Sequence, residues 1–156
     1  MKKSANSNMY TVGLDTAWEL AGARLDGARE ALVCAVSSQA LSEQARRALS
    51  NSAKALGYGD AACAFLALET PGEQPLSGRM LLAALEGLDP LALVVADRAA
   101  GDALAQAYHV AAPAPDAPFR LLGRSGVAFA SLEGMLGTET DKQRAWALLK
   151  RLPRIE

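Results

Sequence analysis

The stretch Leu91-Ala92-Leu93-Val94-Val95-Ala96 decides the fold of this chain. Asp89-Pro90 precedes it and Asp97 follows it, so turn-forming residues bound an apolar run on both sides. A short run of this kind, followed by an alanine-rich helical pattern, is typical of a strand that is buried on both faces of a parallel sheet. Similar runs occur at 31–36, 61–68 and 127–130. The sequence therefore predicts an α/β domain.

Helical patterns separate and follow these runs. Ser77 and Asp97 are placed to cap two of the helices, and Thr140 and Gln143 have the spacing of a capping box at the start of the last one, which Pro153 ends. The helices are expected at about 40–56, 78–87, 98–109 and 140–152.

The alternation of strands and helices predicts how the elements are layered. Every core connection contains a helix or a long crossover and none is a tight hairpin, which indicates parallel strands. Right-handed crossovers place helices on both faces of such a sheet. We therefore expect a three-layer α/β/α sandwich with a four-stranded parallel sheet in the order 2-1-3-4, and a short edge strand at 119–122.

The N-terminal part adds a further helix to this plan. Residues 1–9 are expected to be disordered, and 10–156 to form a single α/β domain. Leu14, Trp18 and Leu25 lie on one stripe of a helix that ends near 27–29. The other helices already cover both faces, so this helix is expected at a sheet edge. Its Trp either completes the monomer or anchors contact with another protein or a second copy.

The composition limits the partners that the chain can have. Of its 156 residues 51% are hydrophobic and 21% are charged, which is typical of a cytoplasmic globular domain. A net charge of -1 provides no overall attraction to nucleic acid or to an anionic membrane. Nucleic-acid contact would have to be local, for example at the basic residues of 142–154. No apolar window approaches the roughly 20 residues of a membrane span, so a membrane partner is not expected.

Polar residues follow the predicted strands where a ligand would bind. In open α/β sheets this place is the edge at the carboxyl ends of the strands, where the strand order reverses. Glu133 lies close to the same edge. The candidate residues for a ligand cleft are Ser37, Ser38, Gln39, Glu69, Asp97, Arg98 and Ser131.

Each of these residues also has a structural interpretation. Ser37, Ser38 and Asp97 are more typical of helix caps than of catalytic groups. His109, at the far end of the helix that begins near Asp97, would lie roughly 18 Å from the cleft, which excludes a Ser-His-Asp triad. Cys34 and Cys63 lie in apolar runs and are expected to be buried and reduced. No residue pattern indicates catalysis, a metal site or a cofactor.

Two phrases of the chain resemble the uracil-DNA glycosylase superfamily, especially its bacterial family-four type. They are Leu88-Asp89-Pro90-Leu91-Ala92-Leu93-Val94-Val95-Ala96-Asp97-Arg98-Ala99-Ala100 and Lys142-Gln143-Arg144-Ala145-Trp146-Ala147-Leu148-Leu149-Lys150-Arg151-Leu152. In that family a proline-led strand precedes a helix with small residues, and a Lys-x-x-x-Trp-x-x-Leu-Lys helix closes the fold. The resemblance spans 31–152 and implies a glycosylase-like fold.

The functional motifs of that family are missing at the matching positions. Its first loop, Gly-Glu-Ala-Pro-Gly, falls on Val36-Ser37-Ser38-Gln39-Ala40, and its His-Pro-Ser motif falls on Ala130-Ser131-Leu132. The position of the Asn that contacts uracil falls near Glu69, and no Phe follows Gln39 to stack a base. The family needs four cysteines to bind its cluster, whereas this chain has two. The resemblance therefore implies no base excision in the manner of the family.

A non-enzymatic relative of these glycosylases suggests which function a chain without the catalytic motifs can have. The psi subunits of bacterial DNA polymerase III clamp loaders are similar in fold, lack the catalytic residues and act by contacting other proteins. The expected function is thus a non-catalytic, glycosylase-like interaction module, and the resemblance admits a link to DNA replication or repair. The alternative is a small-molecule-binding protein, or an enzyme of another mechanism, that uses the polar cleft. An open cleft with converging polar groups would favour the alternative, and a filled one the interaction module.

Overall fold

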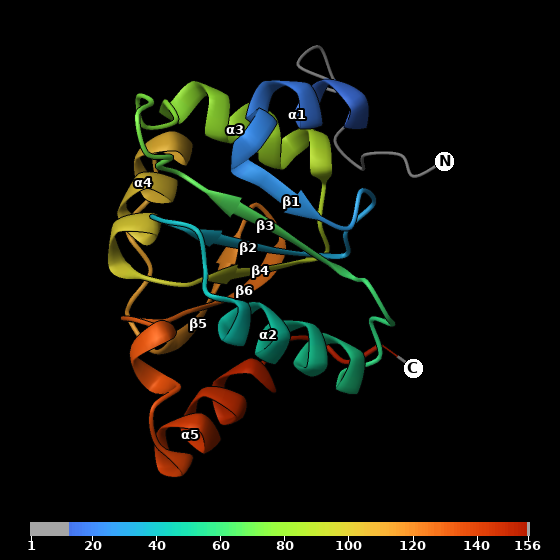
Figure 1. Cartoon of the computed structure of the whole chain (residues 1–156), viewed down its shortest axis with the longest axis vertical. Helices are drawn as coiled ribbons and strands as arrows, with labels where there is room; N and C mark the ends of the chain where they lie inside the picture. Colours follow the sequence, from blue (N-terminus) through green and yellow to red (C-terminus); the bar gives the residue numbers. More distant parts are fainter. Residues whose placement is uncertain (1–12, 156) are drawn as a thin grey trace.

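A six-stranded mixed sheet forms the centre of the domain. The computed structural model describes residues 13–155, and the strand order is β1-β3-β2-β4-β6-β5. The inner strands β3, β2, β4 and β6 run parallel, and β1 and β5 pair antiparallel at the two edges (Figure 1). The strands are β1 (Leu25–Gly27), β2 (Val33–Ser37), β3 (Cys63–Ala67), β4 (Ala92–Val95), β5 (Ala117–Leu121) and β6 (Arg124–Ala128).

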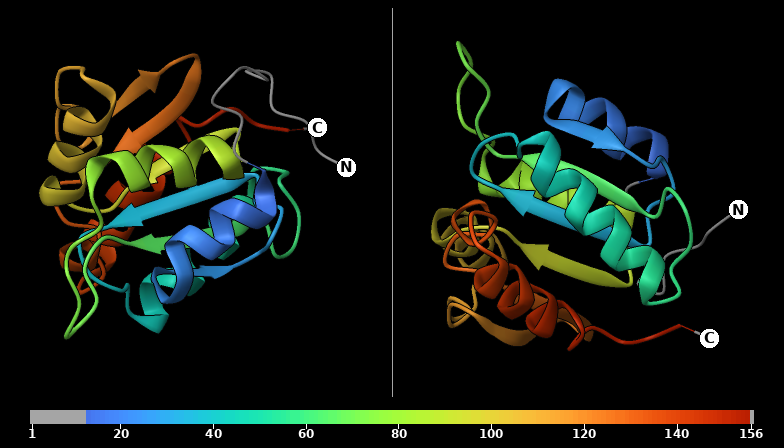
Figure 2. Two further views of the ribbon diagram at one scale, coloured as in Figure 1. Left: turned by 90° about the horizontal axis from the view of Figure 1, so that it is seen from above. Right: turned by 60° about the horizontal axis from the view of Figure 1, so that its bottom comes forward.

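Helices cover both faces of the sheet. Side chains alternate along β2, so that Cys34 and Val36 belong to one apolar core while Val33 and Ala35 belong to the other. Helices α1, α3 and α4 pack on the first core, and α2 and α5 pack on the second (Figure 2). The helices are α1 (Leu14–Ala21), α2 (Glu43–Ala55), α3 (Gly78–Leu88), α4 (Arg98–Tyr108) and α5 (Glu139–Leu149), with single 3₁₀ turns η1 (Gly22–Arg24) and η2 (Glu133–Met135).

The predicted sheet of four parallel strands in the order 2-1-3-4 is wrong in the number of strands and in the order of the sheet as a whole. The predicted core strands lie side by side as β3-β2-β4-β6, but an antiparallel strand joins each edge. At one edge, β5 and β6 form a hairpin through Leu122 and Gly123, whose φ angles are 48° and 85°. Two consecutive positive φ angles define a type I′ turn, which usually carries Asn or Asp at its first position. Because Leu122 occupies this position, the sequence lacks the usual signature of a hairpin turn.

The other edge strand replaces the end of the predicted N-terminal helix. That helix was expected to reach 27–29, but α1 ends at Ala21 because Gly22 adopts a φ of 57° and η1 redirects the chain. Leu25 therefore lies in β1 and pairs with Leu66 of β3. Its apolar side chain fits the spacing of a helical stripe and an edge strand equally well. The predicted disordered segment 1–9 lies outside the described residues.

The helix caps agree with the prediction in part. Ser77 accepts a hydrogen bond from the Met80 N–H, and Asp97 caps α4 as expected. The cap of α2 is Ser42, whose Oγ accepts from the Ala45 N–H, and not Ser37 or Ser38. The cap of α5 is Thr138, whose Oγ1 accepts from the Asp141 N–H, so the predicted capping box at Thr140 and Gln143 is wrong by two positions.

Strand β6 begins earlier than the apolar run at 127–130 indicates. It includes Arg124 and Gly126, residues that do not mark a strand by composition. A Cβ atom at position 126 would lie 2.5 Å from Cζ of Phe119 and 3.1 Å from the Leu93 carbonyl oxygen. The ring of Phe119, on the neighbouring strand β5, lies across this glycine, and any larger residue would have to displace the ring.

Candidate functional site

The carboxyl ends of the inner strands open onto a cleft of about 460 Å³. From β2 the chain crosses through α2 to β3 on one side, and from β3 it returns through α3 to β4 on the other. The strand order therefore reverses between β2 and β4, which is where open α/β sheets bind ligands. Predicted candidates that line the cleft are Ser38, Gln39, Asp97, Arg98 and Ser131.

Two further candidates do not line this cleft. Ser37 is only 3% exposed as the last residue of β2, and its carbonyl oxygen accepts a hydrogen bond from the Leu68 N–H at 2.8 Å. Glu69 lines an adjoining hollow of about 430 Å³, which Gln39 also borders. Ser37 is therefore part of the sheet, while Glu69 faces a separate space beside the cleft.

Asp97 joins the ends of β2 and α4. Its Oδ2 accepts hydrogen bonds from both the backbone N–H and the Oγ of Ser38, each at 3.0 Å. Its Oδ1 accepts from the Ala100 N–H at 2.9 Å and so caps α4. Hydrogen bonds from charged acceptors at a helix N-terminus are among the stronger ones in proteins. The carboxylate holds the two elements together, which leaves it poorly placed to act as a general base.

Glu133 makes a similar contact on the other side of the cleft. Its two carboxylate oxygens accept from the backbone N–H and the Oγ of Ser42, both at 2.7 Å. Ser42 in turn caps α2 through the Ala45 N–H. Sequence analysis placed Glu133 near the cleft but missed its partner Ser42, because their separation in the sequence gives no signal of contact.

The other polar groups of the cleft make fewer contacts within the chain. The Ser131 Oγ accepts from the Gly134 N–H at 3.1 Å. Arg98 is the first residue of α4, and its N–H and that of Ala99 have no acceptor inside the helix. Arg98 and Gln39 are exposed. The cleft therefore offers a cation, an amide and the start of a helix, while Asp97 caps α4 and Glu133 binds Ser42, the cap of α2.

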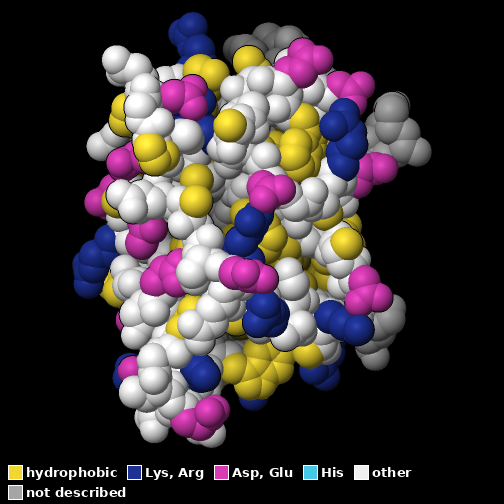
Figure 3. All heavy atoms as spheres, in the orientation of Figure 1, with side chains coloured by type: hydrophobic (Ala, Val, Ile, Leu, Met, Phe, Trp, Pro, Cys, Tyr) yellow, Lys and Arg dark blue, Asp and Glu magenta, His cyan; other side chains and the backbone are white. Residues whose placement is uncertain are grey.

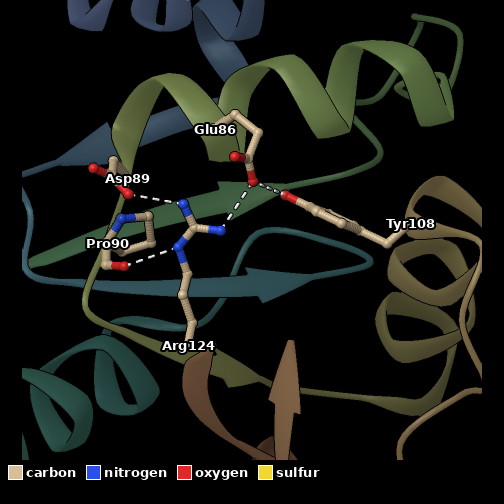
Figure 4. Close-up of polar contacts among 5 residues, drawn as sticks. All are labelled: Glu86, Asp89, Pro90, Tyr108 and Arg124. Carbon is tan, nitrogen blue, oxygen red and sulfur yellow. Dashed lines mark hydrogen bonds and ion pairs between the residues drawn. The ribbon is translucent and has the colours of Figure 1, made fainter. Parts of the chain in front are cut away.

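A buried ionic cluster lies at the opposite ends of the strands (Figure 4). The side chain of Arg124, at the start of β6, is 8% exposed and donates from Nη1 to Glu86 at 2.9 Å and from Nη2 to Asp89 at 2.8 Å. Its Nε donates to the Pro90 carbonyl oxygen at 3.1 Å, and the Tyr108 hydroxyl donates to Glu86 at 2.8 Å. The cluster joins α3, α4, β6 and the turn before β4.

Burial and charge act against each other in this cluster. Burial alone would lower the pKa of Arg124, but its hydrogen bonds to Asp89 and Glu86 outweigh burial and raise it. Burial, and then the hydrogen bond to Glu86, raise the pKa of the Tyr108 phenol. Both groups therefore keep their protons in the folded protein. The sequence gives no sign of this cluster, because an arginine that directly follows a turn is expected to be exposed to solvent.

The predicted interface residues pack within the chain. Leu25 is 5% exposed in β1, and Leu14 and Trp18 of α1 are partly buried against the core beneath them. The Trp18 indole N–H donates to the Arg29 carbonyl oxygen at 3.0 Å, and the Arg29 guanidinium lies 6.0 Å from the ring centre. Trp18 thus covers part of its own domain, and its role in an interface stays a prediction.

The remaining residues singled out in the sequence are structural. His109 adopts a φ of 55° as the C-cap of α4, where its N–H donates to carbonyl groups of the last turn. Cys34 and Cys63 are buried thiols that form no disulfide, as expected, and they lie in different cores. Burial raises the pKa of the Cys63 thiol from 9.0 to about 11, and the Ser50 hydrogen bond opposes this only in part. A buried neutral thiol is a poor nucleophile.

Comparison with known proteins places the chain in no family. No protein-family model matches it, and a search of the curated proteins finds no match. No helix within residues 13–155 has the length and apolar character needed to cross a membrane. The same residues contain no group of three His, Cys, Asp or Glu side chains positioned to hold a metal ion.

Proposed function

We propose that this chain is a non-catalytic, glycosylase-like module that acts by binding another protein. The observation that carries the proposal is the state of the carboxylates at the cleft. Asp97 accepts three hydrogen bonds and Glu133 accepts two from neighbouring groups of the chain. Base excision needs a group that orients water and a group that stabilises the departing base. These hydrogen bonds tie both carboxylates to neighbouring parts of the chain, and no histidine is among the residues that line the cleft.

A test for catalysis uses the full chain, produced in cells without other uracil-DNA glycosylases. The protein is incubated with single-stranded and double-stranded oligonucleotides that contain uracil, and the products are examined for abasic sites. We expect no excision. Excision that is lost in a folded Gln39→Ala variant would contradict the proposal, because Gln39 occupies the matching first loop.

A test for partner binding uses cross-linking in the source cells with the tagged full chain. We expect one or a few proteins to be cross-linked repeatedly to defined residues of the domain, above a tag-only control. Partners that act in DNA replication or repair would support the link that the glycosylase resemblance admits. Cross-links no different from those of the control would contradict the interaction module.

A second candidate function is the binding of a small anionic ligand in the cleft. The cleft is open rather than filled, which is the outcome expected for this candidate, and Arg98 and the start of α4 provide hydrogen-bond donors beside it. Such donors favour an anion. Inorganic phosphate should then raise the melting temperature of the wild type but not that of Arg98→Ala, with chloride at equal ionic strength as the control. An equal response of both proteins would remove this candidate.

A further inference from the structure

We propose that the groove between α2 and α5 binds an acidic segment of another protein through one or two bulky apolar side chains. The proposal rests on the proposed function as a binding module and names its surface and the chemistry of its partner. The α2–α5 groove has a volume of about 260 Å³. Its lining residues are Gln44, Arg47, Ala48, Asn51, Ser52, Leu132, Leu136, Lys142, Ala145, Trp146 and Leu149.

The floor of the groove is apolar. Leu132, Leu136 and Leu149 are at most 8% exposed and belong to the core beneath α2 and α5. The Trp146 side chain packs on the same core from α5. The two helices lie side by side on this face of the sheet, in two views of the domain (Figures 1 and 2). An apolar side chain of a partner would meet leucine and tryptophan at the base of the groove, as anchors of protein interfaces do.

The rim of the groove is cationic. Arg47 of α2 and Lys142 of α5 line it, and no carboxylate is among the lining residues. Lys150 is not among the lining residues, but its Nζ lies 5.6 Å from the centre of the Trp146 ring. Hydrophobic side chains gather between α2 and α5 with Lys and Arg side chains beside them (Figure 3). Since the whole chain has a net charge of -1, this concentration of cations is local and favours an acidic partner.

Acidic neighbours do not cancel this charge. Glu43 pairs with Arg47 at 3.0 Å, but the two side chains are 86% and 66% exposed. Asp141 pairs with Arg144 at 3.6 Å, outside the lining of the groove. Exposed ion pairs of this kind contribute little free energy, so a carboxylate brought close by an apolar anchor can compete for Arg47. Lys142 makes no ion pair within the described part of the chain.

The same features favour a protein segment over nucleic acid. Non-specific binding of single strands uses aromatic faces open to bases along a continuous cationic path. Here Trp146 is the one aromatic residue among those that line the groove, so successive bases would find no series of rings to stack on. The apolar floor is suited to an aliphatic or aromatic side chain, and the rim to carboxylates that flank it.

The test selects random peptides displayed on phage against the immobilised full chain. The selected peptides are then labelled with a fluorescent dye and titrated with the protein in solution, with the anisotropy of the dye as the readout. We expect peptides in which Asp and Glu flank one or two bulky apolar residues. Lys142→Glu should weaken their binding about tenfold or more. This variant is expected to fold, because a carboxylate in the first turn of α5 is compatible with the helix dipole.

Two control variants show whether the effect belongs to the groove. Arg79→Glu makes the same charge change on α3, across the sheet, and should leave peptide binding unchanged. Trp146→Phe should weaken binding less than Lys142→Glu while it preserves the fold. Peptides without acidic enrichment, or binding that is equally sensitive to Lys142→Glu and Arg79→Glu, would overturn the proposal.

Other occupants of the groove would be recognised by their own outcomes. Binding of a single-stranded oligonucleotide that Lys142→Glu abolishes, without acidic peptides in the selection, would overturn the proposal in favour of nucleic acid. A dimer in sedimentation experiments that Lys142→Glu dissociates would overturn it in favour of a second copy. Cellular cross-links that map only to another surface would refute the α2–α5 groove as the binding surface, but they would still support the proposed function as an interaction module. Uracil excision would refute the non-catalytic function without affecting the peptide result.

Discussion

The two ends of the parallel strands use charged residues in opposite ways. At the carboxyl ends, Asp97 and Glu133 border an open cleft and accept hydrogen bonds from the starts of helices. At the amino ends, Arg124 is buried with Glu86 and Asp89 in a closed cluster. The charged groups at the carboxyl ends therefore lie beside open space, whereas those at the amino ends are packed against one another.

This difference follows from the backbone groups that need hydrogen-bond partners at each end of the strands. The N–H groups at helix starts face the carboxyl ends of the strands, and carboxylates satisfy them while remaining near solvent. At the amino ends the loops bring carbonyl oxygens such as that of Pro90 together, and a guanidinium can donate to several acceptors at once. We infer that the amino-end cluster stabilises the domain, whereas the surfaces for binding lie elsewhere.

The variant with the largest expected effect on stability is Arg124→Met, which removes the cation of the buried cluster. It leaves the carboxylates of Glu86 and Asp89, which are 23% and 17% exposed, without their cation. Removal of one partner from a buried ion pair costs about 3–5 kcal/mol. We expect a loss of that size in the free energy of unfolding, measured by urea denaturation. Arg120→Met, in the exposed neighbouring strand β5, is the matched control and should cost about 0.5 kcal/mol or less. Equal losses would mean that burial of Arg124 does not matter.

The second test removes the cap at the open end. Asp97→Ala loses the hydrogen bonds from Ser38 and Ala100, and we expect a loss of about 2 kcal/mol in the free energy of unfolding. Asp97→Asn keeps one acceptor oxygen and should lose about half as much. Asp102→Asn, on the exposed face of α4, serves as the control in the same denaturation experiment. A smaller loss for Asp97→Ala than for Asp97→Asn would contradict the role as a cap.

The regular part of the fold was accessible to prediction from the sequence. The apolar runs at 31–36, 61–68 and 91–96 correspond to β2, β3 and β4 because a strand buried on both faces needs apolar residues throughout. Ser77 and Asp97 were found as caps because a cap lies next to the helix that it serves. In the cleft, Ser38 and Asp97 were placed together by the geometry of parallel strands alone.

Two kinds of feature were missed. A short edge strand was predicted at 119–122, where β5 lies, but the turn at Leu122 and Gly123 lacks the usual residues, so the sequence did not indicate a hairpin with β6. The other missed features depend on contacts between distant residues. Arg124 lies 38 positions from Glu86 in the chain, and a buried arginine has the same sequence signature as an exposed one. The α2–α5 groove combines two helices from opposite ends of the sequence, and only packing brings them together.

Tyr108→Phe tests the closed cluster through its dependence on pH. The loss of the hydroxyl donor to Glu86 should cost about 1 kcal/mol at neutral pH. The pKa of the Tyr108 phenol is raised above its ordinary 10.0 by burial and by Glu86. A group with a raised pKa in the folded state stabilises the protein below pH 10.0, and this contribution is lost as the pH rises further. The decline in stability above pH 10.0 should therefore be shallower in Tyr108→Phe than in the wild type. An equally steep decline in both proteins would show that the Tyr108 phenol does not contribute to the pH dependence of stability.

The smallest expected effect is that of Glu133→Gln at the open end. Both carboxylate oxygens of Glu133 accept from Ser42, but the residue is exposed, and Ser42 still caps α2 through the Ala45 N–H. We therefore expect a loss of about 0.5 kcal/mol or less in the free energy of unfolding. Hydrogen exchange offers a more local readout, because the Ser42 amide should lose protection while amides inside α2 keep theirs. A loss as large as that of Asp97→Ala would show that both sides of the cleft are equally fixed. The open end would then be as rigid as the closed one.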